Sequence, residues 1–421
     1  MPDKEKIIVY GLGYYWKEKF DDISALYDIV ACSDQNEKAS VYAKKYKFVL
    51  PDQISEISYD KIILGCKKRS VRESMILKYN IPADKIFCWN EAFEKNREKK
   101  LVNYTERLTI VIPTYNRRSR LKRTLDLLEL QSNRDFEIVI LDNHSDYNIE
   151  ELLINRRNDF RNKIKVVHNK VNIGMAANLA NAFIQQLEGW IWMLSDDDMP
   201  SIYAVEDIHE EIENAHHIGA INFLIYDIRE KVADRGGTFE SLHELLDFYR
   251  RIISNGCDEG ECSGDFIYFS NKVYNTFYIK QYYQQIFTYA YSGIPQLIPV
   301  LFMLKEGTAN VRISDKKIVA YDGADGDHWD WIKTILGMRI ITDVPLNLDE
   351  KDKSMLYRLT LYNYLDFLIK DVHKETADFD VRQIEKIYEE VYRYSFGRAE
   401  REDYKNKITL LKLKMKNYKC E

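Results

Sequence analysis

The stretch WIWMLSDDD at residues 190–198 decides the fold class of this chain. Its first five residues are apolar and predict a buried strand, which three carboxylates follow directly: Asp196, Asp197 and Asp198. Like charges this close repel one another unless something compensates them. A divalent cation with oxygen ligands, Mn²⁺ or Mg²⁺, would do so. A solvated acidic turn is the alternative, because Asp is also a common turn residue.

On both sides of this strand, short apolar runs alternate with segments whose apolar residues recur at helical spacing. We expect further strands at residues 108–112, 136–141, 164–168 and 218–226, and helices at 118–131, 175–187 and about 239–253. Strands that alternate with helices in this way predict an α/β fold with a parallel sheet. From about residue 353 onward the pattern is helical.

The first hundred residues predict a second, smaller α/β unit, with strands at 6–10, 28–33, 59–65 and 85–88. Gly11 and Gly13 follow its first strand and Asp34 ends the second, which resembles a dinucleotide-binding Rossmann fingerprint. The fingerprint needs a third small residue three positions after the second glycine, and Trp16 stands there. We therefore expect residues 1–98 to form a Rossmann-like accessory domain that binds no NAD.

Composition and charge narrow the class of protein further. The 421 residues are 45% apolar and 30% charged, with 17 Gly and 8 Pro, which excludes collagen-like and low-complexity chains. A net charge of −6 predicts no nucleic-acid partner for the protein as a whole, with a local basic patch as the alternative. The six cysteines form no CxxC pair and are expected to be free thiols, with a disulfide or a metal site at Cys257 and Cys262 as the alternative. Residues 281–304 lack charged side chains but contain Pro295 and Pro299, so they predict a buried loop and helix within a soluble domain.

Polar clusters end three of the expected central strands, at residues 113–117, 142–146 and 196–198. Because the carboxyl ends of strands in an open α/β sheet line the ligand crevice, we expect these clusters to converge on one site. A polar turn at residues 172–178 enters a helix and adds a candidate anion site at its N-terminus.

Four segments carry a family resemblance: TIVIPTYNR at 109–117, EIVILDNHSD at 137–146, VNIGMAANLANA at 171–182 and WIWMLSDDD. In order, spacing and strand context they resemble a family-2 glycosyltransferase of the GT-A fold. The resemblance is close over residues 105–230 and loose over 230–345. It implies an α/β GT-A domain at 104–345 and a helical C-terminal region at 346–421.

The resemblance also implies an inverting sugar transfer from a nucleoside-diphosphate donor, usually a UDP-sugar. By position, the residues lining the nucleotide pocket would be Pro113, Thr114, Tyr115 and Arg117. Asp142 would hydrogen-bond the base, with Asn143 and Asn172 beside it. Asp196 would face the ribose and sugar, with Asp197 adjacent, and Asp198 would hold Mn²⁺ or Mg²⁺, which stabilises the leaving diphosphate.

The chain departs from the pattern of this family at the position expected for the general base. An acidic residue is usual at the start of a helix in the acceptor half, but residues 291–296 contain none. An inverting displacement needs a group that takes the acceptor proton. Asp265 and Asp327 are the candidate catalytic residues, each with an ordinary loop Asp as the alternative. The resemblance makes His328 a second candidate metal ligand.

The resulting expectation is a cytoplasmic enzyme of bacterial surface polysaccharide synthesis that acts on a glycan or lipid-linked acceptor. Residues 404–419 are basic and amphipathic, which suits either a peripheral contact with the inner face of the cell membrane or an ordinary packing helix. A homo-oligomer stays open. Two other functions also stay open: a catalytically inactive relative that binds partners in a synthase complex, and a sugar nucleotidyltransferase.

Overall fold

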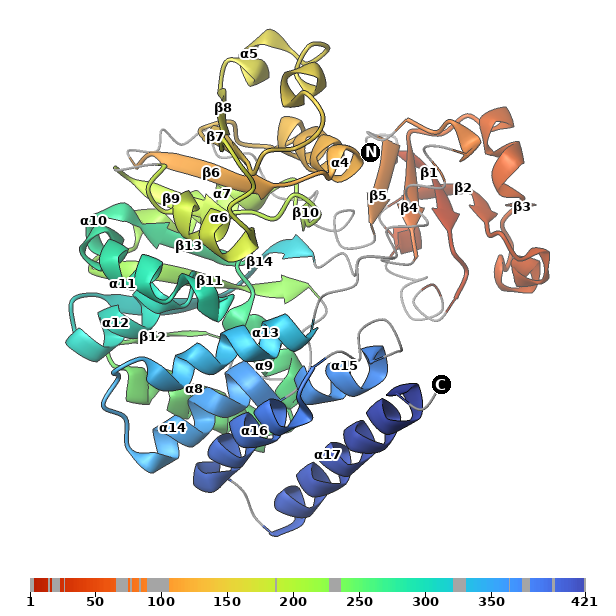
Figure 1. Cartoon of the computed structure of the whole chain (residues 1–421). Coiled ribbons are helices and arrows are strands. Elements are labelled where there is room, and N and C mark those ends of the chain that lie inside the picture. Colours follow the sequence, from red (N-terminus) through yellow and green to blue (C-terminus); the bar gives the residue numbers. More distant parts are fainter. Residues whose placement is uncertain are drawn as a thin grey trace.

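Two β-sheets, one near the N-terminus and one in the centre of the chain, carry the fold in the computed structural model (Figure 1). The structure describes residues 4–13, 16, 23–25, 27–65, 75, 78–82, 85–88, 106–185, 188–226, 236–320, 331–362, 364–372, 379–395 and 398–419. The α/β class expected from the sequence is confirmed.

The N-terminal sheet has five parallel strands in the order β3-β2-β1-β4-β5. Their bounds are β1 Lys6–Tyr10, β2 Asp28–Ser33, β3 Phe48–Val49, β4 Lys61–Leu64 and β5 Ile86–Cys88, with the 3₁₀ turns η1 Glu37–Tyr42 and η2 Pro51–Glu56 between them. The four strands expected from the sequence are present. The two-residue strand β3 was not foreseen, because so short a run gives no periodicity.

The loop after β1 is held by contacts within the chain that involve residues of the resembled fingerprint. The Leu12 backbone N–H donates to Asp34 Oδ2 at 2.8 Å, so part of that carboxylate already holds the loop. Gly65 lies so close to the Gly11 carbonyl that any side chain there would collide with it. Trp16 is buried, and its Nε1 donates to the Tyr42 carbonyl at 2.7 Å.

The central sheet is mixed, with the strand order β10-β14-β11-β13-β9-β6-β7-β8 and β12 paired with β14. The bounds are β6 Leu108–Thr114, β7 Glu137–Asp142, β8 Ile164–His168, β9 Trp190–Met193, β10 Met199–Pro200, β11 Ile218–Tyr226, β12 Gly237–Phe239, β13 Lys272–Asn275 and β14 Asn310–Ala320. Strands β6 to β9 are parallel, whereas β13 runs antiparallel to both β9 and β11.

Register brings the polar strand ends to one edge of this sheet. Thr114 pairs with Asp142, and Asp142 pairs with His168. Strand β9 runs parallel beside β6, so the chain that leaves β9 toward Asp196 emerges next to Thr114. The apolar residues of β6 and β7 are buried on both faces of the sheet, as parallel strands require.

Helices cover both faces of the central sheet (Figure 1). Helices α4 Arg118–Glu129 and α7 Ala204–Glu213 share a core with one face. The other face shares a core with α6 Met175–Ala182, α8 Leu242–Ser254, α9 Glu259–Ile267 and α12 Ile298–Glu306. Shorter elements are η5 Ile149–Leu152, α5 Asn158–Arg161, α10 Thr276–Ile279, η6 Lys280–Tyr282, α11 Tyr283–Thr288 and η7 Ala290–Ser292. The buried loop and helix expected at 281–304 are thus α11, η7 and α12.

The C-terminal helices extend the same core. They are α13 Trp331–Met338, η8 Arg339–Asp343, α14 Glu350–Tyr357, a π-helical turn η9 Arg358–Tyr362, α15 Tyr364–Asp371, α16 Val381–Ser395 and α17 Arg398–Lys419. Along α17, the buried positions recur at helical spacing at Tyr404, Ile408, Leu411 and Met415. Its apolar stripe therefore packs within the protein. Among the described residues, no helix combines the length and apolar character needed to cross a bilayer.

The two sheets meet through a shared apolar cluster. Ile8 and Tyr10 of β1 belong to the same buried cluster as Leu127 of α4 and Met199 of β10. Met199 directly follows Asp198, so the N-terminal unit packs against the strand that leaves the three carboxylates.

Candidate active site

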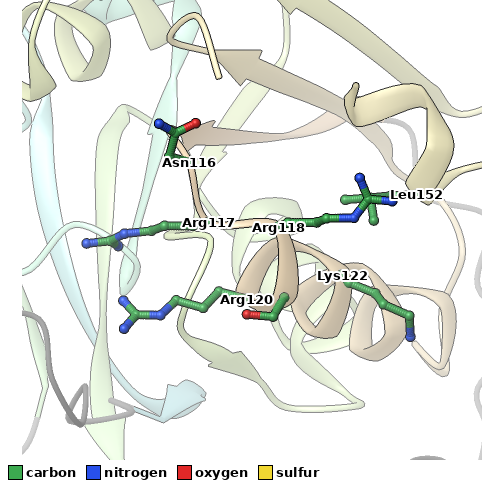
Figure 2. A pocket seen from close by; sticks show the side chains of 7 residues that line it. Asn116, Arg117, Arg118, Arg120, Lys122 and Leu152 are labelled. Carbon is green, nitrogen blue, oxygen red and sulfur yellow. The ribbon is translucent and has the colours of Figure 1, made fainter. Parts of the chain in front are cut away.

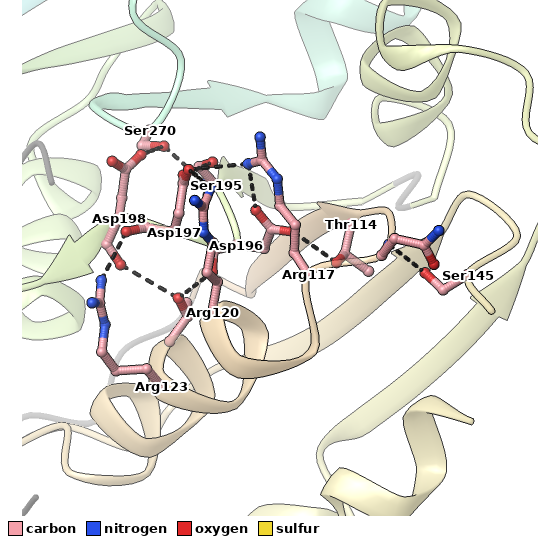
Figure 3. Close-up of polar contacts among 12 residues, drawn as sticks. Thr114, Arg117, Arg120, Arg123, Ser145, Ser195, Asp196, Asp197, Asp198 and Ser270 are labelled. Atoms are coloured by element: carbon pink, nitrogen blue, oxygen red, sulfur yellow. Dashed lines mark hydrogen bonds and ion pairs between the residues drawn. The ribbon is translucent and has the colours of Figure 1, made fainter. Parts of the chain in front are cut away.

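Asp196, the first of the three consecutive carboxylates, is buried and tied to the end of β6 (Figure 3). Its Oδ2 accepts a hydrogen bond from Thr114 Oγ1 at 2.7 Å, and its Oδ1 accepts one from Arg117 Nη1 at 3.1 Å. Burial raises the pKa of Asp196 to about 6 and the charge of Asp197 adds to this, while Arg117 opposes it. The expected neighbours Thr114, Arg117 and Asp196 are therefore brought together.

Asp197 faces the arginines of α4. Its Oδ2 accepts from Arg117 Nη1 at 3.0 Å and lies 3.4 Å from Arg120 Nη1, while Ser195 Oγ donates to its Oδ1 at 2.5 Å. Arg123 Nη2 donates to the Asp197 backbone carbonyl at 2.9 Å. In this structure, part of the charge compensation that the sequence assigned to a metal ion comes from guanidinium groups.

Asp198 is held by a hydroxyl group from another part of the chain. Ser270 Oγ, in the turn before β13, donates to Asp198 Oδ2 at 2.5 Å and accepts from the Ser195 backbone N–H at 2.9 Å. Burial raises the pKa of the nearby Tyr268 phenol well above its ordinary value, and the Asp198 charge adds to this. Asp198 is only 2% exposed, so its orientation is set by these contacts.

Of the two expected metal ligands, Asp198 lies within the described residues, so the fit of a metal ion is considered at Asp198. A carboxylate such as Asp198 is of the kind that Mg²⁺ and Mn²⁺ prefer. Within the described part of the chain, no three His, Cys, Asp or Glu side chains form a group that could hold an ion. The other expected ligand, His328, and the candidate base Asp327 lie outside the described residues. The last residue of β14, Ala320, pairs with Met199, the residue that follows Asp198.

The residues expected around the nucleobase also lie together, at the ends of β7 and β8. Asp142 is buried, and its Oδ1 accepts the Ser145 backbone N–H at 3.0 Å. Asn143 Nδ2 donates to Asn172 Oδ1 at 2.8 Å, and Asn143 Oδ1 accepts the Ile173 N–H at 3.0 Å. These amide contacts fix the turn before α6 against the end of β7.

A hollow of about 590 Å³ opens beside these strand ends (Figure 2). It is lined by Asn116, Arg117, Arg118, Ser119, Arg120, Lys122 and Leu152. Arg117 and Arg120 extend to the same side, toward the carboxylates. Tyr115 is 41% exposed at the end of β6, and Pro113 pairs with Leu141 within the sheet. Of the residues expected to line the nucleotide pocket, Arg117 lines this hollow, whereas Pro113, Thr114 and Tyr115 are not among its lining residues.

Asp265 is not brought to this edge. It lies on α9 with no exposed surface, and its Oδ2 accepts hydrogen bonds from Tyr249 Oη at 2.9 Å and Asn222 Nδ2 at 3.2 Å. Lys272 Nζ donates to its backbone carbonyl at 2.9 Å. In the described structure, this carboxylate belongs to a buried polar network.

Residues that the sequence analysis did not single out complete the site. No sequence pattern pointed to Ser270, because its contact with Asp198 depends on strand β13, which was not predicted. His168 and Tyr147 could have been found, since both lie at or just beyond the ends of expected strands. Burial raises the pKa of the Tyr147 phenol to about 12, and the charges of Asp196 and Asp142 add to this.

Polar and acidic side chains thus gather at the carboxyl ends of parallel strands, where open α/β sheets bind their ligands. The glycosyl transferase family 2 model matches residues 109–277, and a C2185-like N-terminal model matches residues 3–87. Residues 109–277 are a family-2 glycosyltransferase domain.

Two curated relatives match part of the chain. An uncharacterized glycosyltransferase of Haemophilus influenzae is 28% identical over 133 residues, which cover 31% of this chain and 42% of that protein. The poly(ribitol-phosphate) beta-N-acetylglucosaminyltransferase TarP of Staphylococcus aureus is 25% identical over 107 residues, which cover 25% of this chain and 32% of TarP. The chain thus spans less than half the length of either relative.

Solved structures with a similar arrangement include S. aureus TarS 1–349 in complex with UDP-GlcNAc. It has a TM-score of 0.46 and 15% identity, covering 73% of this chain and 90% of that one. Another is the mannosyltransferase PcManGT of Pyrobaculum calidifontis in complex with GDP-Man and Mn²⁺, with a TM-score of 0.39 and 10% identity, covering 77% of this chain and 90% of that one.

Proposed function

We propose that this protein is a metal-dependent, inverting glycosyltransferase that moves a sugar from a nucleoside-diphosphate donor, UDP-linked, to a glycan or lipid-linked acceptor of bacterial surface polysaccharide synthesis. The observation that carries the proposal is the contact of Asp196 with Thr114 and Arg117. Thr114 in turn pairs with Asp142 on the neighbouring strand β7. A base on Asp142 and a ribose on Asp196 would bring the diphosphate toward Asp198 and the arginines of α4.

In the reaction, an acceptor hydroxyl oxygen attacks the anomeric carbon of the donor sugar. The bond from that carbon to the diphosphate oxygen breaks, and the acceptor proton passes to a general base. Of the two candidate bases we assign the role to Asp327, because Asp265 would have to leave its buried network to act. A bound Mn²⁺ or Mg²⁺, held by Asp198 and His328, would supply stabilisation of the leaving diphosphate.

The test is incubation of the protein with UDP-GlcNAc, UDP-glucose, UDP-galactose and GDP-mannose, with Mn²⁺ or with EDTA. Metal-dependent release of the nucleoside diphosphate supports the proposal and identifies the sugar. Release of pyrophosphate from a nucleoside triphosphate would instead indicate a sugar nucleotidyltransferase. If the protein binds a donor but turns none over, even when acceptor extracts are added, it is an inactive relative in a synthase complex.

The inactive relative is supported by one observation. Residues 291–296, where the family usually carries its base, include Gln296, whose Nε2 donates to the Ile267 carbonyl at 2.6 Å within the core. Donor hydrolysis by the wild-type protein would exclude this alternative.

A peripheral membrane contact is a separate part of the proposal. Leu410 and Leu413 of α17 are 47% and 54% exposed, and they share the outer half of the helix with Lys405, Lys412 and Lys416. Basic residues near an anionic surface contribute about 1 kcal/mol each. Sedimentation with vesicles that contain phosphatidylglycerol, compared with neutral vesicles, tests the contact and the inner-membrane localisation that it implies.

A further inference from the structure

The imidazole ring of His168 bridges two carboxylates at the edge of the candidate donor site. Its Nδ1 lies 2.9 Å from Asp142 Oδ2, and its Nε2 lies 2.9 Å from Glu150 Oε1. The β7–β8 register places His168 opposite Asp142. Glu150 comes from η5, whose N-terminus is capped by Asn148.

Both contacts can be hydrogen bonds only when the ring is protonated, because a neutral imidazole has a single N–H to donate. The titratable groups that face the ring are Asp142 on β7 and Glu150 on η5. The hydrogen bond to Glu150, followed by that to Asp142, raises the pKa of His168, and the same bond lowers the pKa of Glu150. The bridge is therefore a cation between two anions.

Asp142 needs such a partner because it is buried. It is 3% exposed, and its other oxygen, Oδ1, already accepts the Ser145 N–H. A nucleobase that covers it would remove what water remains. A buried carboxylate is stable only if it is paired or fully hydrogen-bonded.

We propose that His168 is a positioning residue for the donor nucleobase: held by Glu150, its imidazolium keeps the Asp142 carboxylate oriented and charge-compensated when the base covers it. This inference rests on the proposed function, in which Asp142 binds the base. A carboxylate kept in this state accepts hydrogen bonds and donates none. It suits a base that presents a ring N–H, as uracil and guanine do, and disfavours cytosine and adenine.

A pH dependence follows from this arrangement. The folded pKa of His168 lies above its ordinary 6.5, so the cation is present below that raised value and is lost as the pH rises through it. Donor affinity should fall by about tenfold over that step, a coupling of ordinary size between a proton and a ligand. The turnover number should change less than KM, because His168 acts on binding of the base.

Calorimetric titration of the full chain with UDP-GlcNAc, from about pH 5.5 to about 8.5, tests this inference. A nucleotide sugar is the suitable probe because its diphosphate does not titrate in that range. In the wild type we expect the affinity to fall above the raised pKa of His168. His168→Gln should lose this step, and Glu150→Gln should shift it to lower pH. Glu151→Gln, which instead removes a partner of Arg118, is the matched control and should leave the step in place.

Thermal unfolding of His168→Gln shows whether the variant is folded, and Glu150→Gln, at an exposed position, tests the inference without disturbing the sheet. A pH profile that is the same in the wild type, His168→Gln and Glu150→Gln overturns the inference while the proposed function stands. A wild-type chain that binds neither UDP-GlcNAc nor GDP-mannose overturns the proposed function and the inference with it.

Discussion

The guanidinium group of Arg117, the residue at the N-cap position of α4, lies 3.1 Å from Asp196 Oδ1. The same Nη1 is 3.0 Å from Asp197 Oδ2. One side chain therefore joins the end of β6 to two of the three carboxylates after β9. The first helix of the transferase domain and its acidic strand end are thus positioned by the same contact.

Replacing Arg117 by Ala should lower kcat/KM about a hundredfold, because the buried Asp196 loses a charged partner and the diphosphate loses a cation. Arg134→Ala is the matched control: Arg134 forms an exposed pair with Asp159, away from the hollow, and exposed pairs contribute little to stability. Steady-state kinetics with the donor identified in the panel measures both variants. Equal effects of the two substitutions would contradict the role given to Arg117.

Asp198→Asn should abolish metal-dependent transfer and leave the fold intact. A site that no longer stabilises the leaving diphosphate raises the barrier by several kcal/mol, hence about a thousandfold or more in rate. Turnover in the presence of Mn²⁺ measures the loss of transfer, and circular dichroism shows whether the variant is folded. Wild-type turnover in this variant would exclude Asp198 as a metal ligand.

His328→Ala should weaken Mn²⁺ binding and lower activity strongly, if this residue completes the coordination shell as the resemblance implies. Mn²⁺ affinity is measured by calorimetry in the presence of UDP. The same affinity and the same rate as in the wild type would place His328 outside the site.

Asp265→Asn distinguishes a catalytic from a structural carboxylate. Since Asp265 accepts hydrogen bonds from Tyr249 and Asn222 in the core, the variant should lower the free energy of unfolding by about 1–3 kcal/mol. Chemical denaturation and initial rates are measured on the same preparation. If Asp265 were the general base, the rate would collapse while the stability stayed that of the wild type.

No binding of NAD, NADP or their reduced forms is expected at the N-terminal unit, since Asp34 already holds the Leu12 N–H and Trp16 occupies the third fingerprint position. Fluorescence titration of the full chain with NADH is the measurement, repeated with excess UDP to exclude binding at the transferase site. Micromolar binding that UDP does not displace would make Gly11, Gly13 and Asp34 cofactor residues.

Strands with continuous apolar runs could be predicted from the sequence almost residue by residue. Those at 164–168 and 218–226 have the expected bounds, and the strand expected at 108–112 continues for two residues, to Thr114. Strand β14 could not be predicted, because its sequence NVRISDKKIVA mixes charged and apolar residues and its place is set by pairing with β11 and β10. Periodicity does not report such non-local pairing.

The same distinction applies to the site. Thr114, Asp142 and Asp196 could be placed because each ends an apolar strand, and strand ends meet at one edge of a parallel sheet. The arginine pairs of Asp197, the Ser270 contact and the His168 bridge depend on which side chains tertiary packing brings together. A sequence shows that these residues are polar, but not which of them become partners.

The apolar cluster shared by β1, Leu127 and Met199 also bears on how the protein can be divided. A truncated chain that begins at the transferase domain would expose Leu127 and Met199 to water, and Met199 is the immediate neighbour of Asp198. Such a fragment would be prone to self-association. The loss of the first unit would thus lower solubility and loosen the strand end that carries the three carboxylates, even if that unit binds no small molecule. For recombinant expression, the two units are best kept as one piece.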